Sequence, residues 1–448
     1  MSGIAQKLIR LSRRPEARHV GILTSGSIAA QVALVATSPL LSRLFSPAAF
    51  GVFSLMLTIS TIAGAIGGLC YEVAVILPRS RRAAKSLYRL AFALSFITPC
   101  LMVSLVALVQ HAFPRILGRT LPADFYFYCL AGTILTTQIN VLCYGHSRAG
   151  QYGAISMNKI TQTIMPAVAQ IALAYLGMTG EGLMLGRVLG LLGSELWLTR
   201  RLPLGYRLRD LADAKIGHMM VAGHTYRDFL VQVPRQLLVR GATMLPAALL
   251  LGSYGPTVAG LYFFAQRLIE RPGMLLGDSL TRVPMKQFAM RVQNGKRLTR
   301  AALLYTAAVG APVVLGVVVL ALIAHPLFRV IFGARWEPAA DYSVALAGWA
   351  AIRLASLPMA TLTTVLRAQK MSFFVDALAA ARVAVIPVLA AHRFGPLVAV
   401  SAFCGLSVIY HLVIVAMGVV FSLRYDRSLE PAPEGAHETF VRTGETYV

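Results

Sequence analysis

The stretch AALLYTAAVGAPVVLGVVVLALIA, residues 301–324, has no charged side chain, and it decides the fold class of this chain. A helix that crosses about 30 Å of hydrocarbon needs about 20 apolar residues at a rise of about 1.5 Å per residue. This stretch is long enough to do so. Comparable stretches follow one another from residue 20 to residue 422. The sequence therefore predicts an all-α polytopic membrane protein.

The composition supports the same fold class. Of 448 residues, 57% are hydrophobic and 13% are charged, whereas a soluble domain has about 25% charged residues. About 12 transmembrane helices are predicted, of which the fourth, fifth and tenth are interrupted by polar residues. They cover residues 20–41, 49–71, 87–110, 123–144, 152–176, 180–199, 229–251, 256–280, 301–324, 339–366, 371–391 and 396–422.

The distribution of positive charge predicts the orientation of these spans. The chain has a formal net charge of +24 and 42 Lys and Arg residues. With the N-terminus in the cytoplasm, 27 of them fall in cytoplasmic segments, six in external loops and nine within or beside spans. This bias follows the positive-inside rule and predicts that both termini are cytoplasmic. Topology and attraction to the membrane surface thus explain the charge, and nucleic acid is not expected as a partner.

The spans divide into two halves of six. The hydrophilic loop 200–227 separates a predicted N-lobe, residues 20–199, from a predicted C-lobe, residues 228–422. Two halves in the same orientation imply a pseudo-two-fold axis along the membrane normal, with a substrate site between them. The basic segment 1–19 and the acidic segment 423–448 are expected to be cytoplasmic, the second of them disordered. Similar sequences recur in the halves: AAFGVF (48–53) with TVAGLYF (257–263), and RAGQY (148–152) with RAQKM (367–371).

Ionisable residues inside the predicted spans indicate what the chain binds. A charged side chain at the bilayer centre costs about 2.5–3.5 kcal/mol, so such residues face a partner or a water-filled cavity. The basic surplus predicts an anionic substrate, and arginine suits phosphate because its planar guanidinium donates paired hydrogen bonds. The nine basic residues are Lys159, Arg187, Arg235, Arg240, Arg267, Arg271, Arg282, Arg353 and Arg382, and the five acidic ones are Glu72, Glu195, Glu270, Asp278 and Asp376.

The stretch YFFAQRLIERPGMLLGDSL, residues 262–280, concentrates these charges. At about 1.5 Å per residue, Arg240 and Arg267 each lie about 16 Å into the bilayer and are expected to meet near its midplane. Arg267 and Arg271 share one helix face, and Pro272 is expected to kink the helix. The predicted substrate site consists of Arg235, Arg240, Arg267, Arg271 and Arg353, completed from the first half by Lys159 and Arg187.

These residues also have a structural interpretation, in which they pair with neighbours and bind nothing else. Lys159 and Arg187 could instead extend toward the membrane surface. The alternative pairs are Arg267 with Glu270, Lys159 or Arg187 with Glu195, Arg353 stacked on Trp349, and Arg382 with Asp376.

No motif predicts an enzyme. The chain contains no Walker A or HExxH pattern, and its five cysteines lie in or at the ends of apolar spans without metal-ligand spacing. No cofactor or metal is expected. Membrane enzymes of surface polysaccharides usually keep a sizeable external loop, whereas the largest one predicted here, residues 325–338, is too short for a folded domain. A transporter is favoured.

Several stretches of the chain carry a likeness to a known family. They are LFSPAAFGVFSLMLTIS (44–60), LCYEVAVILPRS (69–80), YRDFLVQVPRQLL (226–238), AGLYFFAQRLIERPGMLLGDSL (259–280) and VIFGARWEPAADY (330–342). They resemble bacterial polysaccharide flippases of the Wzx type, within the multidrug/oligosaccharidyl-lipid/polysaccharide (MOP) flippase superfamily. Tyr71-Glu72 followed by Leu77-Pro78 is the most specific part. The relatives often have proline where this chain has Phe229, and Pro234 is expected to take over its helix-breaking role.

The resemblance implies two six-helix lobes that form a V around a central cavity, open alternately to the cytoplasm and to the exterior. It implies a flippase of the bacterial inner (plasma) membrane that moves a polyprenyl-diphosphate-linked oligosaccharide to the outer leaflet, for export of O-antigen, capsule or exopolysaccharide. Membrane lipid and other polysaccharide polymerisation and export proteins are expected partners.

Ion gradients or membrane potential drive transport in the superfamily. A buried carboxylate near arginine can exchange a proton for a salt bridge, so Glu72, Glu270 and Asp278 are the expected coupling or gating residues. For Glu72 the structural alternative is an ion pair with Arg79 or Arg89.

Three other functions compete with a flippase. A drug or cation antiporter of the same superfamily would need an acidic cavity, which nine basic against five acidic intramembrane residues disfavour. An enzyme that acts on lipid-linked sugars would need the missing external loop. A membrane scaffold without transport would pair every intramembrane arginine with an acid.

Overall fold

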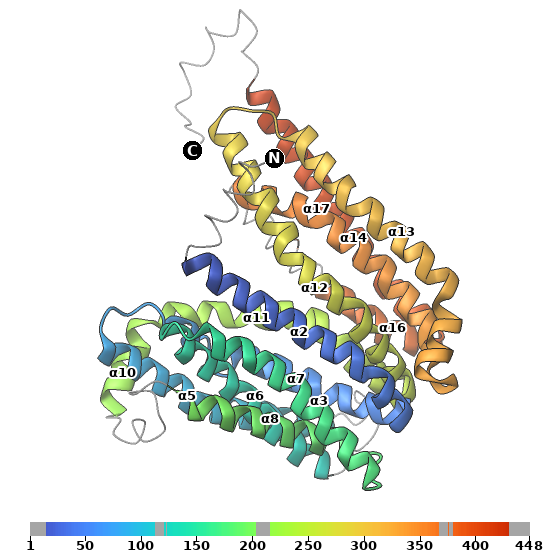
Figure 1. Cartoon of the computed structure of the whole chain (residues 1–448). Helices are drawn as coiled ribbons and strands as arrows, with labels where there is room; N and C mark the ends of the chain where they lie inside the picture. The colour runs from blue at the N-terminus through green and yellow to red at the C-terminus, as the bar shows by residue number, and fades with distance from the viewer. Residues whose placement is uncertain are drawn as a thin grey trace, which may run out of the picture.

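The computed structural model describes residues 15–112, 121, 123–202, 216–366, 375 and 380–429, except the side chains of 15–20, 271, 272, 274–279, 282 and 364 (Figure 1). The long helices are α2 (Pro15–Leu44), α3 (Pro47–Ile66), α5 (Arg81–Ala112), α6 (Ala123–Arg148), α7 (Tyr152–Tyr175), α8 (Gly182–Arg200), α11 (Gln232–Tyr254), α12 (Pro256–Gln293), α13 (Thr299–Phe332), α14 (Ala339–Val365) and α17 (Pro396–Ser428). Short elements are α4 (Tyr71–Ala74), α10 (Ile216–Thr225) and α16 (Val385–Ala391), with 3-10 turns η1 (Arg227–Val231), η2 (Ala334–Trp336) and η3 (Ala381–Ala384). These ranges contain no β-strand.

The predicted fold class, an all-α polytopic membrane protein, is confirmed. Eight of the described helices are long and apolar enough to cross a membrane. Three further helices at predicted spans, α7, α8 and α12, are also long, but they carry ionisable residues such as Lys159, Glu195 and Arg267 that lower their hydropathy. The predicted span 371–391 is described only at residue 375 and from residue 380 onward.

Several helices differ in length from the predicted spans. Helix α12 runs past residue 280 to Gln293, and α17 runs to Ser428, inside the segment predicted to be disordered. Helix α3 ends earlier, at Ile66, because the chain turns there before α4. The described part of the loop 200–227 contains α10. Helices extend beyond the hydrocarbon where their ends are polar, which a count of apolar residues does not detect. Residues 1–14, 203–215 and 430–448 lie outside the described residues.

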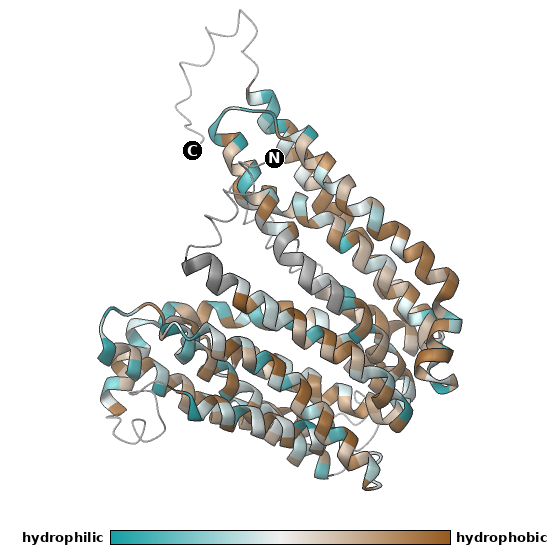
Figure 2. Cartoon of the chain, viewed as in Figure 1, coloured by the Kyte–Doolittle hydropathy of each residue, from teal (hydrophilic) through white to brown (hydrophobic). Residues whose placement is uncertain are grey.

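The helices are arranged in two bundles (Figure 1). Helices α2, α3 and α5 to α8 form the first bundle; α12, α13, α14, α16 and α17 form the second, with α11 packed against both α3 and α12. The ribbons of the two bundles diverge toward the end where α2 begins and α17 ends, and they converge at the opposite end. Helix α13 is strongly apolar, and Leu315, Val318 and Leu322 on its surface are exposed, as suits a helix that faces lipid (Figure 2).

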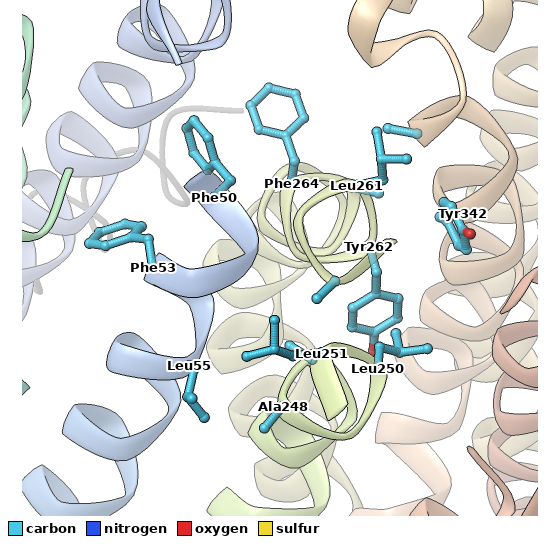
Figure 3. Packing of buried hydrophobic residues seen from close by; sticks show 14 of the residues in the cluster. Phe50, Phe53, Leu55, Ala248, Leu250, Leu251, Leu261, Tyr262, Phe264 and Tyr342 are labelled. Atoms are coloured by element: carbon cyan, nitrogen blue, oxygen red, sulfur yellow. The ribbon is translucent and has the colours of Figure 1, made fainter. Parts of the chain in front are cut away.

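Aromatic side chains join the bundles at the end where they converge. Phe50 of α3 lies beside Phe264 of α12 (Figure 3), and their ring centroids are 5.7 Å apart in an edge-on arrangement. Phe53 of α3 packs edge-on against Phe263 of α12. Trp336 of η2 is fully buried against the rings of Phe50 and Phe264. Its indole N–H donates a 2.7 Å hydrogen bond to the carbonyl of Ser42 in α2. The first and second bundles therefore share one core at this end.

Glycines allow α3 and α12 to approach closely. A Cβ atom at Gly51 would overlap the carbonyl oxygen of Pro256, and a Cβ atom at Gly260 would overlap that of Pro47. Both positions therefore require glycine for a steric reason. The sequences around these two glycines are the ones whose similarity suggested an internal repeat.

We expect Gly260→Ala to lower the thermal stability of the folded protein. The new methyl group would force α3 and α12 apart, and overpacking of this kind costs about 1–3 kcal/mol. Melting curves in detergent, followed by intrinsic fluorescence, measure the change. Gly316→Ala on α13 is the matched control, because a Cβ atom there meets nothing within 4 Å. Equal melting temperatures for the two variants would show that the seam tolerates a methyl group.

Candidate functional site

A cavity of about 320 Å³ lies within the second bundle and is closed on one side by α11. The α11 residues that line it recur at spacings of three and four, so they form one face of that helix. The cavity combines three guanidinium groups with aromatic rings. Its lining residues are Arg235, Leu238, Val239, Ala242 and Thr243 of α11, Trp349 and Arg353 of α14, Arg382 of η3, and Tyr410 and His411 of α17.

The cavity reaches the middle of the helices. Arg353 and Tyr410 each follow the first residue of their helix by 14 positions, which is about 21 Å along the helix axis. Arg235 lies in the first turn of α11. The cavity therefore extends from near one end of α11 to a depth where a charged group needs a partner or water.

The Arg382 guanidinium is held by aromatic rings. Its central carbon lies 5.1 Å from the centroid of Tyr410 and 5.8 Å from that of Phe403. A cation over an aromatic face gains about 0.5–2 kcal/mol, more where water is excluded. Phe403 is in turn packed edge-on against Trp349, with centroids 5.6 Å apart. These rings fix the direction in which Arg382 presents its N–H groups.

A buried carboxylate of α12 contacts Arg353, one of the residues that line the cavity. Glu270 is buried, and its Oε1 lies 4.0 Å from Nη1 of Arg353. The side-chain amide of Gln266 donates to the same oxygen at 3.2 Å and to the carbonyl of Thr243 at 3.1 Å. Glu270 therefore acts as a counter-ion to Arg353, a partner that neither the predicted substrate site nor the alternative of stacking on Trp349 included. Three arginines and one carboxylate leave the described surroundings of the cavity positively charged.

Most polar groups on the cavity wall are hydrogen-bond donors. Guanidinium and indole groups donate and cannot accept. The indole N–H of Trp349 is buried, and no hydrogen-bond partner for it occurs in the described part of the chain. His411 is buried, and its Nδ1 lies 3.1 Å from the hydroxyl of Ser356. Such a wall fits a ligand rich in acceptor oxygens, namely a phosphate or carboxylate group.

Two of the predicted site residues, Arg235 and Arg353, line this cavity. Arg240 does not: it follows Arg235 by five positions, which places it about 140° away around α11, and it is exposed. Arg267 is partly buried on α12 and is also absent from the lining. The cavity therefore does not bring Arg240 and Arg267 together with Arg235.

The other predicted substrate residues lie elsewhere or are outside the described side chains. Lys159 of α7 donates a 2.8 Å hydrogen bond to the hydroxyl of Ser27 in α2. Arg187 of α8 donates to the carbonyl of Gln162 at 3.2 Å. Both residues thus link helices of the first bundle. Arg271, Pro272 and Asp278 lie in α12, and their side chains are outside the described part.

Glu72 occupies a strained turn between α3 and α5. Leu69 (φ 51°) and Cys70 (φ 62°) are consecutive residues in the left-handed region, which costs about 1–2 kcal/mol per non-glycine residue. The Glu72 side chain is buried, and its Oε2 has no hydrogen-bond partner among the described residues. Burial raises the pKa of the Glu72 carboxyl to about 7. The alternative ion pair of Glu72 with Arg79 or Arg89 is not found in the described part of the chain.

Four aromatic or basic residues of the cavity were not in the predicted site: Trp349, Arg382, Tyr410 and His411. Arg382 and Trp349 were interpreted as structural, and Tyr410 and His411 were not singled out. The available signals were an arginine in span eleven and a lone histidine in an otherwise apolar span twelve. Neither signal reveals that η3 turns Arg382 onto the rings of α17.

Solved structures with the same arrangement define the class of protein. The chain matches "Lipid II flippase MurJ, inward closed conformation", with a TM-score of 0.65, 12% identity and coverage of 90% of each chain. It matches an inward-facing multidrug resistance MATE family transporter of the MOP superfamily (TM-score 0.53, 13% identity, 91% of this chain and 94% of that one). An outward-facing MATE transporter matches similarly (TM-score 0.54, 14% identity, 94% and 98%). The chain therefore shares the fold of these three membrane proteins.

The family follows from the sequence itself. A family model described as polysaccharide biosynthesis protein matches residues 40–341, about two thirds of the chain. The chain belongs to this family, which confirms the relationship predicted from its motifs. No curated protein sequence matches the chain.

Proposed function

We propose that the chain is a flippase that moves a polyprenyl-diphosphate-linked oligosaccharide from the cytoplasmic to the outer leaflet of the bacterial inner membrane. The observation that carries this proposal is the cavity of Arg235, Arg353 and Arg382 at intramembrane depth. A sugar head group cannot cross hydrocarbon, and a diphosphate needs cationic donors to replace its hydration. Membership in a polysaccharide biosynthesis family and the fold of a lipid II flippase support the same substrate class.

In this proposal the cavity binds an anionic part of the head group while the lipid tail stays in the bilayer. Arg240, Arg267 and Arg271 line the route taken by the diphosphate, and Lys159 and Arg187 complete it from the first bundle. Both termini are cytoplasmic. Membrane lipid and proteins of polysaccharide polymerisation and export are the partners.

The three acidic residues have different roles in this proposal. Glu270 neutralises Arg353 until the anion arrives and exchanges for it. Glu72 has no basic partner in the described part of the chain, so it is the better candidate for binding a proton. Asp278 remains a candidate for coupling on the strength of its sequence position.

Reconstitution into proteoliposomes tests the function. Protein-dependent flipping of a polyprenyl-diphosphate-linked oligosaccharide, under an imposed proton gradient, is the expected result. Cation export without flipping would identify an antiporter instead. Chemical change of the lipid-linked sugar would identify an enzyme. Folded protein that shows none of these activities with several lipid-linked glycans would contradict the proposal.

A further inference from the structure

The turn that carries Glu72 is tied to its surroundings from two directions. Arg148 at the end of α6 donates hydrogen bonds to the carbonyls of Val75 (2.7 Å), Ile76 (3.1 Å) and Pro78 (2.8 Å). The hydroxyl of Tyr71, the residue before Glu72, donates to the carbonyl of Gly223 in α10 at 3.1 Å. The first contact fixes the turn to its own bundle. The second connects it to the segment that leads into the second bundle.

We use the term joint for α4, α10 and η1, which meet at this place. Helix α10 packs on α5, and η1 contacts α4. Phe229 of η1 and Tyr226 before it pack against the same apolar cluster as Tyr71. Helix α11 begins directly after η1, and Arg235, which lines the cavity, is its fourth residue. A movement of the joint would therefore shift the helix that presents Arg235.

Glu72 lies at the buried side of this joint, and its Oε2 has no hydrogen-bond partner among the described residues. A Cβ atom added at Gly68 would meet the carboxylate of Glu72 and the methyl group of Ala91 in α5. Among the described residues, Cys70 beside it and Tyr144 of α6 interact electrostatically with Glu72. Helix α5, which packs on α4, carries the buried Tyr88 and the half-buried Lys85 and Arg89. The Arg148 guanidinium is engaged by the three carbonyls. The charged or titratable residues of α10 and η1, His218, His224, Arg227 and Asp228, are exposed.

We propose that Glu72 is a protonation switch of the joint: the neutral carboxyl lets the joint close over it, and the carboxylate requires water and opens the joint. This inference rests on the proposed alternating access, and it assigns the regulation to the connection between the bundles. A buried carboxylate without a cationic partner is costly, whereas the neutral acid fits an apolar site. Opening releases the Tyr71 hydrogen bond, and with it α10 and the start of α11.

The direction of the pH effect follows from the carboxyl group. In the closed joint, burial raises the pKa of Glu72 from 4.5 to about 7. In the open, hydrated joint it has the ordinary value. The closed joint is therefore favoured fully below about pH 4.5, and this preference is lost as the pH rises to about 7. Linkage between these two pKa values makes the open form roughly thirtyfold more populated at pH 8 than at pH 5.5.

Hydrogen–deuterium exchange of peptides from residues 216–231 tests the switch, with the full-length protein in lipid nanodiscs. After correction for intrinsic exchange rates, wild type is expected to exchange roughly thirtyfold faster at pH 8 than at pH 5.5. Glu72→Gln, which stays neutral, should exchange slowly at both pH values. Tyr71→Phe, which lacks the hydroxyl, should exchange fast at both. Glu181→Gln, at an exposed position before α8, is the control and should behave as wild type.

The outcomes separate this inference from the proposed function. A wild type without pH-dependent exchange, or a Glu72→Gln variant that keeps it, overturns the switch. Because wild type and Tyr71→Phe test it as well, a Glu72→Gln variant that fails to fold still leaves a decisive result. Flipping in proteoliposomes without pH-dependent exchange would leave the flippase standing and remove the switch. If the exchange depends on pH as expected but the protein flips no lipid-linked sugar, the switch stands and the flippase proposal fails.

Discussion

Replacing Arg353 and Arg382 together by glutamine is expected to reduce flipping of a lipid-linked oligosaccharide by about 100-fold or more. Each guanidinium lines the cavity and can donate charge-assisted hydrogen bonds to an oxyanion. A hydrogen bond to a charged group contributes about 1.5–3 kcal/mol, and each 1.4 kcal/mol corresponds to about tenfold in affinity. Two such losses give the expected factor. Initial rates of flipping in proteoliposomes, at equal protein content, measure it.

Loss of Arg353 also affects folding, because Arg353 is the counter-ion of the buried Glu270. The two charged groups lie 4.0 Å apart, and taking a cationic partner from a buried carboxylate destabilises a protein. The triple variant Arg353→Gln, Arg382→Gln, Glu270→Gln removes both charges and should fold better than the double variant. It should be equally inactive, because the anion site is still lost.

Arg240→Gln separates the contribution of the cavity from that of the rest of the proposed route. Arg240 lies on the same helix as Arg235 but on a different face, and it is exposed. We expect this variant to lose less than about tenfold in flipping rate, as for one solvated contact. A double cavity variant that flips as wild type would make the three-arginine cavity a structural feature. A single Arg240 substitution as damaging as the double variant would place the anion site on the other face of α11.

The fold class was predictable from sequence because hydropathy is a property of each segment on its own. Residues 301–324 read as a membrane span without reference to any other part of the chain, and α13 covers them. The recurring glycine motif could also be recognised from the sequence, since the residues around Gly51 and those around Gly260 are similar. The structure adds the reason, which is close approach of α3 and α12 at both residues.

The cavity was not predictable in the same way because it depends on helix rotation and on contacts between helices. Depth along the axis placed Arg240 and Arg267 together, but depth does not say which face of α11 a residue occupies. The structural alternative pairs Glu270 with Arg267, three positions earlier on the same helix, and helical periodicity cannot indicate Arg353 of α14, whose Nη1 lies 4.0 Å from Glu270. Arg382 lies in a break between helical segments, η3, where helical periodicity gives no direction for a side chain.

The second large effect is expected at the opposite end of the molecule. Trp336→Ala should separate the two bundles where they converge. The Trp336 ring centroid lies 4.3 Å from that of Phe264 and 5.1 Å from that of Phe50, and its N–H binds the Ser42 carbonyl. The side chain therefore contacts α2, α3 and α12. Truncating a buried tryptophan lowers the stability of a folded protein by about 3–5 kcal/mol. Here it destabilises the conformation in which the two bundles are in contact at Trp336.

In an alternating-access protein, such a loss shifts the population toward the form that is open at this end. Spin labels at Glu181, before α8, and at Arg335, in η2, report the separation of the bundles by pulsed electron paramagnetic resonance; both residues are exposed. Trp336→Ala should add or enlarge a longer-distance component. Trp197→Ala is the control, because Trp197 stacks on Arg201 at the other end of α8 and contacts neither label site. An unchanged distance distribution would show that Trp336 does not hold the bundles together.

Trp336→Phe distinguishes ring packing from the hydrogen bond. Phenylalanine keeps an aromatic contact with Phe264 and Phe50 but leaves the Ser42 carbonyl without its indole donor. Because an unsatisfied buried group costs about 1–3 kcal/mol, this variant should give a shift of smaller size than Trp336→Ala. If both variants gave the same shift, the bond between η2 and α2 would be the main closure of this end. If Trp336→Phe gave none, the aromatic packing between α3 and α12 alone would close it, and the stability loss of Gly260→Ala would arise in that same contact.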